Sequence, residues 1–174
     1  MAKTYKTTRT KNSIQDDEYQ PSLVSEPAPA IGLNFNNPLV YIATLLGIAP
    51  LQTEMQYVQA SRNGIKKAAL AKLISKMGIT QDKMCQLLHI STRTYQRLKD
   101  ADTLDIYSSE QAIEMAQVLA KAQSIFTTDV AVKQWLHAPL IALGGVEPIN
   151  LLDTGFGAKL LLDTLGRIEY GVYS

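Results

Sequence analysis

A short stretch between Ser91 and Lys99 concentrates side chains that can bind nucleic acid. Its polar positions carry hydroxyl, amide and cationic groups, on Ser91, Thr92, Arg93, Thr94, Gln96, Arg97 and Lys99. An arginine can make two hydrogen bonds to guanine and a glutamine two to adenine, while threonine and lysine can hold phosphates. If these side chains share the exposed face of one helix, the stretch predicts a helix that reads DNA.

The residues around this stretch predict the two helices needed to present it. Thr80 is a suitable N-cap for a first helix, whose apolar residues recur at helical spacing at Met84, Leu87 and Leu88. The pattern then breaks, and Ser91 can cap a second, short helix. Tyr95 and Leu98 are expected to face inward on that second helix, which leaves its polar residues facing out.

This pattern is that of a helix-turn-helix. Such DNA readers place a small residue in the first helix, a left-handed residue at the turn, then an aliphatic residue and a polar cap, here Cys85, His89, Ile90 and Ser91. Glycine is commoner at the turn, but histidine is among the residues that tolerate a positive φ, so we expect His89 to adopt one. The alternative interpretation is an ordinary helical hairpin in an all-α domain.

The charge distribution favours the DNA-reading interpretation. Residues 62–99 carry nine basic residues and one acidic residue, a net charge of +8, whereas residues 100–174 carry four basic and ten acidic residues, a net charge of −6. Such an asymmetry indicates two surfaces with different partners. Four of the cations precede the helix-turn-helix, at Lys66, Lys67, Lys72 and Lys76, where they either contact phosphates or form a solvated face.

The remaining pattern predicts an all-α fold. Apolar periodicity, caps and helix-ending glycines predict helices over residues 38–46, 50–62, 65–77, 110–126, 129–136, 148–152 and 155–170. Ser108 or Ser109 is the expected cap of the longest helix, whose wide apolar face belongs in the core or in a dimer interface. Trp135 is expected to be a core anchor.

We divide the chain into three parts. Residues 1–35 are polar and proline-rich and are expected to be a disordered arm, either solvated or touching DNA phosphates through its cations. Residues 36–104 are expected to form a helix-turn-helix DNA-binding domain. Residues 105–174 are expected to form a helical domain for dimerisation and partner binding.

Other chemistry has little support in the sequence. The lone cysteine, Cys85, fits a small buried residue, and His89 and His137 have no acidic or thiol ligands nearby in sequence, so we expect no metal site, no cofactor and no catalytic residue. No apolar run reaches the length of a membrane span, and the basic start lacks an apolar core, so a cytoplasmic protein is expected.

The C-terminal part resembles the Xre/ParS/MbcA-type antitoxins. The resemblance extends from about Leu39 to Ser174 and is most specific in the last third, at Pro139, Leu143-Gly144-Gly145, Pro148, Leu151–Thr154, Gly157-Ala158 and Gly166–Ser174. The helix-turn-helix fits the Xre-like region of such antitoxins, although His89 departs from the usual glycine.

This resemblance implies a homodimeric type II antitoxin. Its partner would be a RES-domain toxin that depletes NAD⁺, whose active site the antitoxin covers with its C-terminal region, and it would bind its own operator to repress transcription. By position, the residues expected to face the toxin are Arg167, Glu169, Tyr170, Tyr173 and Ser174. The alternative for the tyrosines is packing against the chain's own last helices.

Three competing functions remain at this point. A stand-alone helix-turn-helix regulator would share the DNA-reading stretch and differ only in what its C-terminal part binds. An enzyme would need a nucleophile, a base and an orienting group, which the sequence does not bring together. A helical adaptor would have no use for the basic cluster, and its DNA affinity would not fall steeply with salt.

Overall fold

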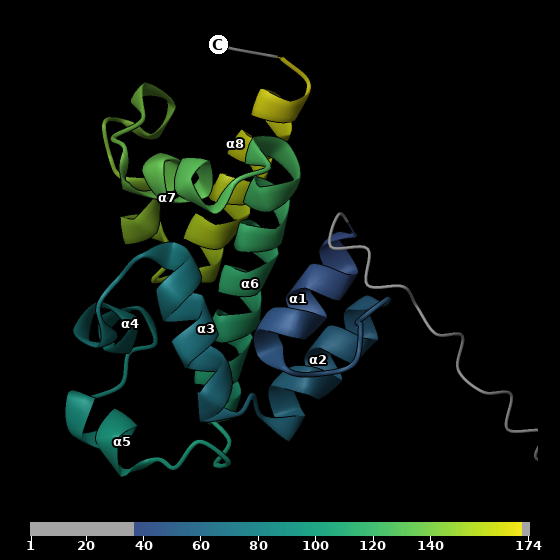
Figure 1. Cartoon of the computed structure of the whole chain (residues 1–174), viewed down its shortest axis with the longest axis vertical. Helices are drawn as coiled ribbons and strands as arrows, with labels where there is room; N and C mark the ends of the chain where they lie inside the picture. Colours follow the sequence, from purple (N-terminus) through teal and green to yellow (C-terminus); the bar gives the residue numbers. More distant parts are fainter. Residues whose placement is uncertain (1–36, 172–174) are drawn as a thin grey trace, which may run out of the picture. The chain divides into compact units, whose positions relative to one another are not determined.

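Residues 37–171 are described by a computed structural model, and they confirm the all-α prediction (Figure 1). This part of the chain contains no β-strand. Its elements are α1 (Pro38–Leu46), α2 (Glu54–Asn63), α3 (Lys67–Met77), α4 (Gln81–Leu87), α5 (Thr92–Arg97), α6 (Ile106–Phe126), α7 (Asp129–His137), the 3₁₀ helices η1 (Ile141–Leu143) and η2 (Pro148–Leu151), and α8 (Gly155–Glu169). The predicted arm over residues 1–35 lies outside the described residues. So do the predicted toxin-facing residues Tyr173 and Ser174.

The 21-residue helix α6 organises the core. It packs against α1, α2, α3, α7 and α8, and Figure 1 shows it between α3 on one side and α1 and α2 on the other. Met115 and Leu119 are fully buried along it, so truncating either to alanine would cost about 2–5 kcal/mol. The wide apolar face predicted for this helix is therefore a core face.

The predicted start of α6 is wrong by one turn. Asp105, not a serine, is the N-cap: its carboxylate accepts hydrogen bonds from the Ser108 backbone N–H at 2.9 Å and from the Ser108 hydroxyl at 2.8 Å. Burial pushes the pKa of Asp105 up, but these hydrogen bonds outweigh it and hold the pKa below its usual value. A carboxylate also interacts favourably with the positive end of the helix dipole, which explains why Asp105 takes the cap.

The neighbouring serine has a long-range role instead. Ser109 is fully buried, and its hydroxyl accepts the Ile65 backbone N–H at 2.9 Å. Ile65 is also fully buried but precedes α3, which begins at Lys67 rather than at the predicted residue 65. Likewise α2 begins at Glu54, because Thr53 and Gln56 form a reciprocal capping box there.

Most helix caps were predicted correctly. The side chains of Asn37, Thr80, Thr128 and Thr154 each accept a backbone N–H at the start of α1, α4, α7 and α8. At the start of α8 the backbones approach closely, since a Cβ added to Gly157 would lie 1.8 Å from the Leu151 carbonyl oxygen. Only glycine fits there, and η2 is thereby seated directly against α8.

Candidate functional site

The two helices α4 and α5 form the predicted helix-turn-helix. His89 at the turn has a φ of 55°, as expected. Cys85 and Tyr95 are buried, so the pair has a packed inner face. The predicted DNA-contacting residues all lie on the exposed side of α5 and its ends, at Ser91, Thr92, Arg93, Thr94, Gln96, Arg97 and Lys99. The hydroxyl of Ser91 is engaged as the cap of α5, accepting the Thr94 backbone N–H at 2.9 Å.

The cations of α5 are available for a ligand. Within residues 37–171, none of Arg93, Arg97 and Lys99 takes part in an ion pair. Side chains that are exposed, cationic and uncompensated suit the phosphates and base edges of DNA.

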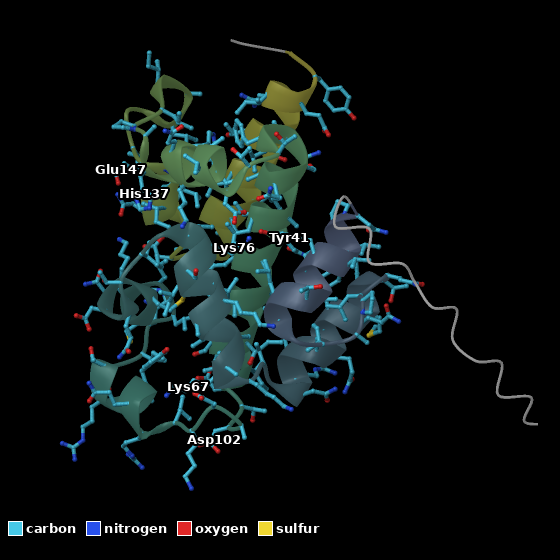
Figure 2. The ribbon with its side chains drawn as sticks, in the orientation of Figure 1. Tyr41, Lys67, Lys76, Asp102, His137 and Glu147 are labelled. Atoms are coloured by element: carbon cyan, nitrogen blue, oxygen red, sulfur yellow. The ribbon has the colours of Figure 1, made fainter. Side chains whose placement is uncertain are left out.

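The lysines of α3 behave differently. Lys67, labelled in Figure 2, donates to the Leu98 carbonyl at 2.7 Å and lies 4.8 Å from the centre of the Tyr95 ring. Lys72 donates to the Thr44 carbonyl at 2.8 Å, and Lys76 pairs with Asp129 at 2.6 Å. Three of the four lysines that could have contacted phosphates therefore form hydrogen bonds to groups of the same chain. The bond of Lys67 holds the end of α5.

The turn of the helix-turn-helix is tethered to the segment that precedes α8. The imidazole Nε2 of His89 lies 2.7 Å from the Asp153 carbonyl oxygen, to which it must donate. Beside it, Lys83 Nζ donates to Asn150 Oδ1 at 2.8 Å. His89 tolerates the positive φ that usually requires glycine at this turn. Unlike glycine, it also supplies a long-range hydrogen bond.

We predict that His89→Asn lowers the free energy of unfolding by about 0.5–1.5 kcal/mol, the usual worth of one hydrogen bond. Asparagine accepts the left-handed backbone but is too short to reach Asp153. Urea denaturation followed by circular dichroism measures the change. Asp153→Ala is the matched control, since the acceptor is a backbone carbonyl that this variant keeps. Unchanged stability in His89→Asn would show that the tether contributes nothing.

At the other end of α8, the residues expected to face the toxin are exposed. Tyr170 has 81% of its surface exposed, so it does not pack against the chain's own helices as the alternative required. Arg167 is exposed as well, while Glu169 pairs with Lys121 of α6 at 2.5 Å and fastens the last turn of α8. The other two predicted residues, Tyr173 and Ser174, lie outside the described residues.

The structure adds one residue that sequence reasoning missed. Ile141 is 97% exposed at the start of η1, in a small loop between α7 and η2 that is closed by a hydrogen bond from the Leu140 backbone N–H to the Val146 carbonyl at 3.2 Å. Single exposed aliphatic side chains are common on protein surfaces, so Ile141 by itself is a candidate contact residue and not a defined site. In the sequence, Ile141 sits within an apolar run that looks like core, so periodicity could not identify it.

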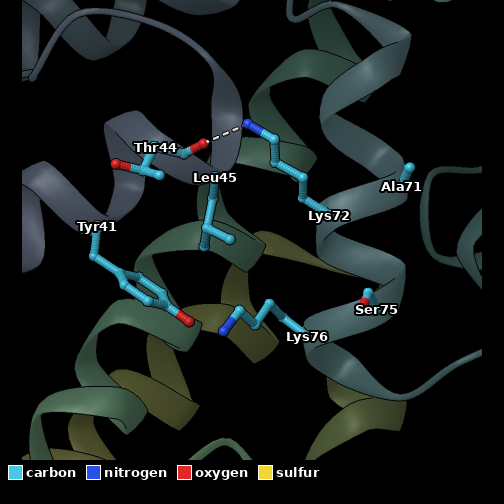
Figure 3. Close-up of a pocket in the computed structure, with 7 residues that line it drawn as sticks. All are labelled: Tyr41, Thr44, Leu45, Ala71, Lys72, Ser75 and Lys76. Atoms are coloured by element: carbon cyan, nitrogen blue, oxygen red, sulfur yellow. Dashed lines mark hydrogen bonds between the residues drawn. The ribbon is translucent and has the colours of Figure 1, made fainter. Parts of the chain in front are cut away.

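A groove lies between α1 and α3, and its titratable groups are Tyr41, Lys72 and Lys76 (Figure 3). Lys72 spans it to the Thr44 carbonyl. Burial raises the pKa of Tyr41 although Lys76 opposes this. The lining contains no carboxylate, histidine or cysteine, and consists of Tyr41, Thr44, Leu45, Ala71, Lys72, Ser75 and Lys76.

Cys85 is a buried free cysteine. Burial, with a smaller contribution from Asp82, raises the pKa of Cys85, so its thiol stays protonated and a weak nucleophile. Across residues 37–171 no three histidine, cysteine or acidic side chains gather as metal ligands would. In the same residues, no helix has the length and apolar character needed to cross a membrane.

Two protein-family descriptions match the chain. Residues 56–117, from α2 into α6, match the antitoxin Xre-like helix-turn-helix domain. Residues 121–171, through α7 and α8, match the antitoxin Xre/MbcA/ParS C-terminal toxin-binding domain. The chain belongs to the Xre/MbcA/ParS antitoxins.

Curated relatives agree with this assignment. The Prs ADP-ribosylating antitoxin of Sphingobium sp. is 26% identical over 123 residues, which are 65% of this chain and 77% of the relative. An antitoxin Xre of Photorhabdus laumondii is 34% identical over 89 residues, 49% of this chain and 59% of the relative, less than two thirds of its length. An antitoxin Xre of Pseudomonas putida is 23% identical over 130 residues, 75% of this chain and 81% of the relative.

The family assignment confirms the resemblance found in the sequence. It also places the exposed face of α5 and the end of α8 in two different domains. The reader helix α5 lies inside the helix-turn-helix domain of this antitoxin, and Arg167, Glu169 and Tyr170 lie inside its toxin-binding domain. The antitoxin therefore has one domain for DNA and one for a toxin. The roles of the individual residues remain predictions.

Proposed function

We propose that this antitoxin neutralises a RES-domain toxin that depletes NAD⁺, and that as a homodimer it represses its own operator. The observation that supports the toxin-binding part of the proposal is the exposure of Tyr170, which directly follows α8 and has 81% of its surface exposed. An aromatic side chain presented to solvent is a suitable anchor for a partner's pocket. Both activities belong to the cytoplasm, where operator DNA is.

On the toxin side, α8 supplies a rigid support and its end supplies the contacts. Glu169 in the last turn of α8 pairs with Lys121 of α6, and Arg167 and Tyr170 are exposed beside this pair. Tyr173 and Ser174 come three and four residues after Tyr170 in the sequence, and we propose that they contact the toxin as well. Ile141 provides a second apolar anchor in the same domain.

On the DNA side, the proposal places α5 in the major groove. Arg93, Gln96 and Arg97 would contact base edges, and Ser91, Thr92, Thr94 and Lys99 would position the helix on phosphates. Lys67 supports this role, because it holds the end of α5 against α3 from within the protein.

A second candidate for the toxin's chemistry comes from one relative. The name of the Sphingobium antitoxin refers to ADP-ribosylation of Prs. The cognate toxin of this chain could accordingly transfer ADP-ribose to a protein rather than deplete NAD⁺. The stand-alone regulator has less support, since it leaves the toxin-binding domain without a role.

Co-expression with the neighbouring gene tests the proposal. The neighbour's product, expressed alone, is expected to stop growth and lower cellular NAD⁺, and with this antitoxin it should co-purify and leave NAD⁺ unchanged. Growth arrest with normal NAD⁺ and an ADP-ribosylated protein would indicate the second chemistry. A neighbour that is harmless and does not co-purify would favour the stand-alone regulator.

A further inference from the structure

The reader helix α5 is too short to hold its own position. It spans only the six residues Thr92–Arg97, and isolated helices shorter than about 12–15 residues are marginal in water. Ser91 caps its start, but its C-cap, Leu98, is extended, with φ −68° and ψ 137°, so no left-handed residue closes its end. The last turn of α5 must therefore be held by groups from elsewhere in the fold.

Lys67, the first residue of α3, supplies such a group. Its Nζ donates to the Leu98 carbonyl at 2.7 Å and lies 4.8 Å from the centre of the ring of Tyr95, the buried residue of α5. Its ion pair with Asp100 is long, at 4.0 Å, and the Lys67 side chain is 16% exposed against 86% for Asp100. The ammonium is thus mostly withdrawn from water at the C-terminal end of α5, where a cation is favourable.

The backbone joins the same two segments. The N–H groups of Lys67 and Ala68 donate to the carbonyls of Asp102 and Asp100, at 2.9 and 3.2 Å. Lys66, the N-cap of α3, makes no side-chain capping bond within residues 37–171, so the chain that leaves α5 caps α3 instead. Figure 2 labels Lys67 and Asp102 at this junction. The start of α3 and the end of α5 are therefore fastened to one segment.

The acidic residues after α5 also take part in this junction. A carboxylate beside a DNA-reading helix repels phosphates, so Asp102 is unexpected there on electrostatic grounds. Its carboxylate accepts the Lys99 backbone N–H at 2.8 Å, and its own N–H donates to the Lys99 carbonyl at 3.0 Å. Asp102 and Lys67 therefore hold two consecutive residues, Lys99 and Leu98, at the end of α5.

We propose that Lys67 is a positioning residue for operator recognition: it holds α5 in the orientation that brings Arg93, Gln96 and Arg97 to base edges, and does not itself contact DNA. This rests on the operator binding in the proposed function and names a residue that governs its specificity. Hydrogen bonds to base edges need precise geometry, whereas attraction to phosphates depends on the number of cations and tolerates a tilted helix. Loss of the Lys67 ammonium should therefore affect operator DNA far more than random-sequence DNA.

Direct contact of Lys67 with a phosphate is the competing role. It conflicts with the burial of the side chain and with its hydrogen bond to Leu98, which the ammonium would have to give up. Lys66, the preceding residue, is exposed and makes no ion pair within residues 37–171, so it suits a phosphate better. The two adjacent lysines therefore provide a matched comparison.

Specificity measured on Lys67→Met provides the test, since methionine keeps an apolar stem and removes the ammonium. Fluorescence anisotropy at several salt concentrations gives the affinities of the full chain for operator DNA and for random-sequence DNA of the same length. The ratio of the two affinities should fall at least about tenfold in Lys67→Met, with the salt slope for random-sequence DNA unchanged. Lys67→Arg, which keeps the cation, and Lys66→Met should both retain the wild-type ratio.

A second measurement needs no DNA. The N–H groups of Tyr95 and Leu98 donate to the carbonyls of Ser91 and Thr94 within α5, so their hydrogen exchange reports opening of this helix. Their exchange should be at least about tenfold faster in Lys67→Met than in wild type, and unchanged in Lys66→Met.

An unchanged affinity ratio in folded Lys67→Met would overturn the proposal, whatever the exchange rates. So would a lower salt slope, because Lys67 would then be a phosphate ligand. If Lys67→Met does not fold, Lys67→Gln, which keeps a shorter neutral donor, is judged by the same criteria. A wild-type chain that binds operator DNA no better than random-sequence DNA would overturn the operator binding itself, and the exchange rates would then show separately whether Lys67 holds α5.

Discussion

Deleting residues 169–174 is expected to abolish toxin neutralisation and leave the fold intact. The deletion removes Tyr170, the exposed aromatic anchor, and the residues that follow it, but none of the buried residues of α8. Loss of a central aromatic contact with its flanking residues should weaken toxin binding at least about 100-fold, or about 3 kcal/mol. Growth of cells that co-express the toxin measures neutralisation, and calorimetry of the purified proteins measures affinity.

The deletion also removes Glu169 and its ion pair with Lys121, so a control must separate the two losses. Lys121→Ala breaks the same pair and keeps the tail. Because an exposed ion pair contributes only about 0–1 kcal/mol, this variant should still protect cells. If the truncated chain protects as well as wild type, the C-terminal end does not cover the toxin's active site.

Arg93→Ala and Arg97→Ala are each expected to weaken operator binding by about 1–3 kcal/mol if they contact base edges. Both side chains are exposed on α5, and neither makes an ion pair within the described residues, so their removal costs the fold little. Fluorescence anisotropy with operator DNA at several salt concentrations measures the loss. Each lost phosphate contact would also lower the salt slope by about one.

Arg167 provides the matched control for this experiment. Like the other two it is an exposed arginine near a helix end, but it lies in the toxin-binding domain. Arg167→Ala should therefore leave operator affinity unchanged, while the double variant of Arg93 and Arg97 should leave toxin neutralisation unchanged. Wild-type operator affinity in the double variant would mean that another element occupies the DNA groove.

Local signals in the sequence predicted the helices well and failed where several caps competed. Asn37, Thr80, Thr128 and Thr154 were recognised because each acts within the first turn of its own helix. At the start of α6, three polar residues lie within one helical turn and could each be the cap, namely Asp105, Ser108 and Ser109. Asp105 is the cap because its carboxylate accepts two hydrogen bonds from Ser108. Ser109 is buried, and its hydroxyl accepts the Ile65 backbone N–H instead.

The exposure of some candidate site residues was also predictable from local sequence, and that of others was not. The residues of α5 were predicted as an exposed set, because a six-residue helix with one buried aromatic leaves little choice of face. The exposure of Ile141 was not predictable. It depends on a loop closed across Leu140 and Val146, whereas the same apolar run would be buried if the chain continued as a helix.

By itself, the sequence determined the helical class, most caps, the left-handed turn at His89 and the antitoxin resemblance, since these follow from residues within a few positions of one another or from a linear motif. Only the tertiary structure decided the partners of the polar side chains. His89 contacts a carbonyl 64 residues away, and Lys67 one 31 residues away. Such pairs form when packing of apolar faces brings distant segments together, and local spacing carries no record of which segments meet.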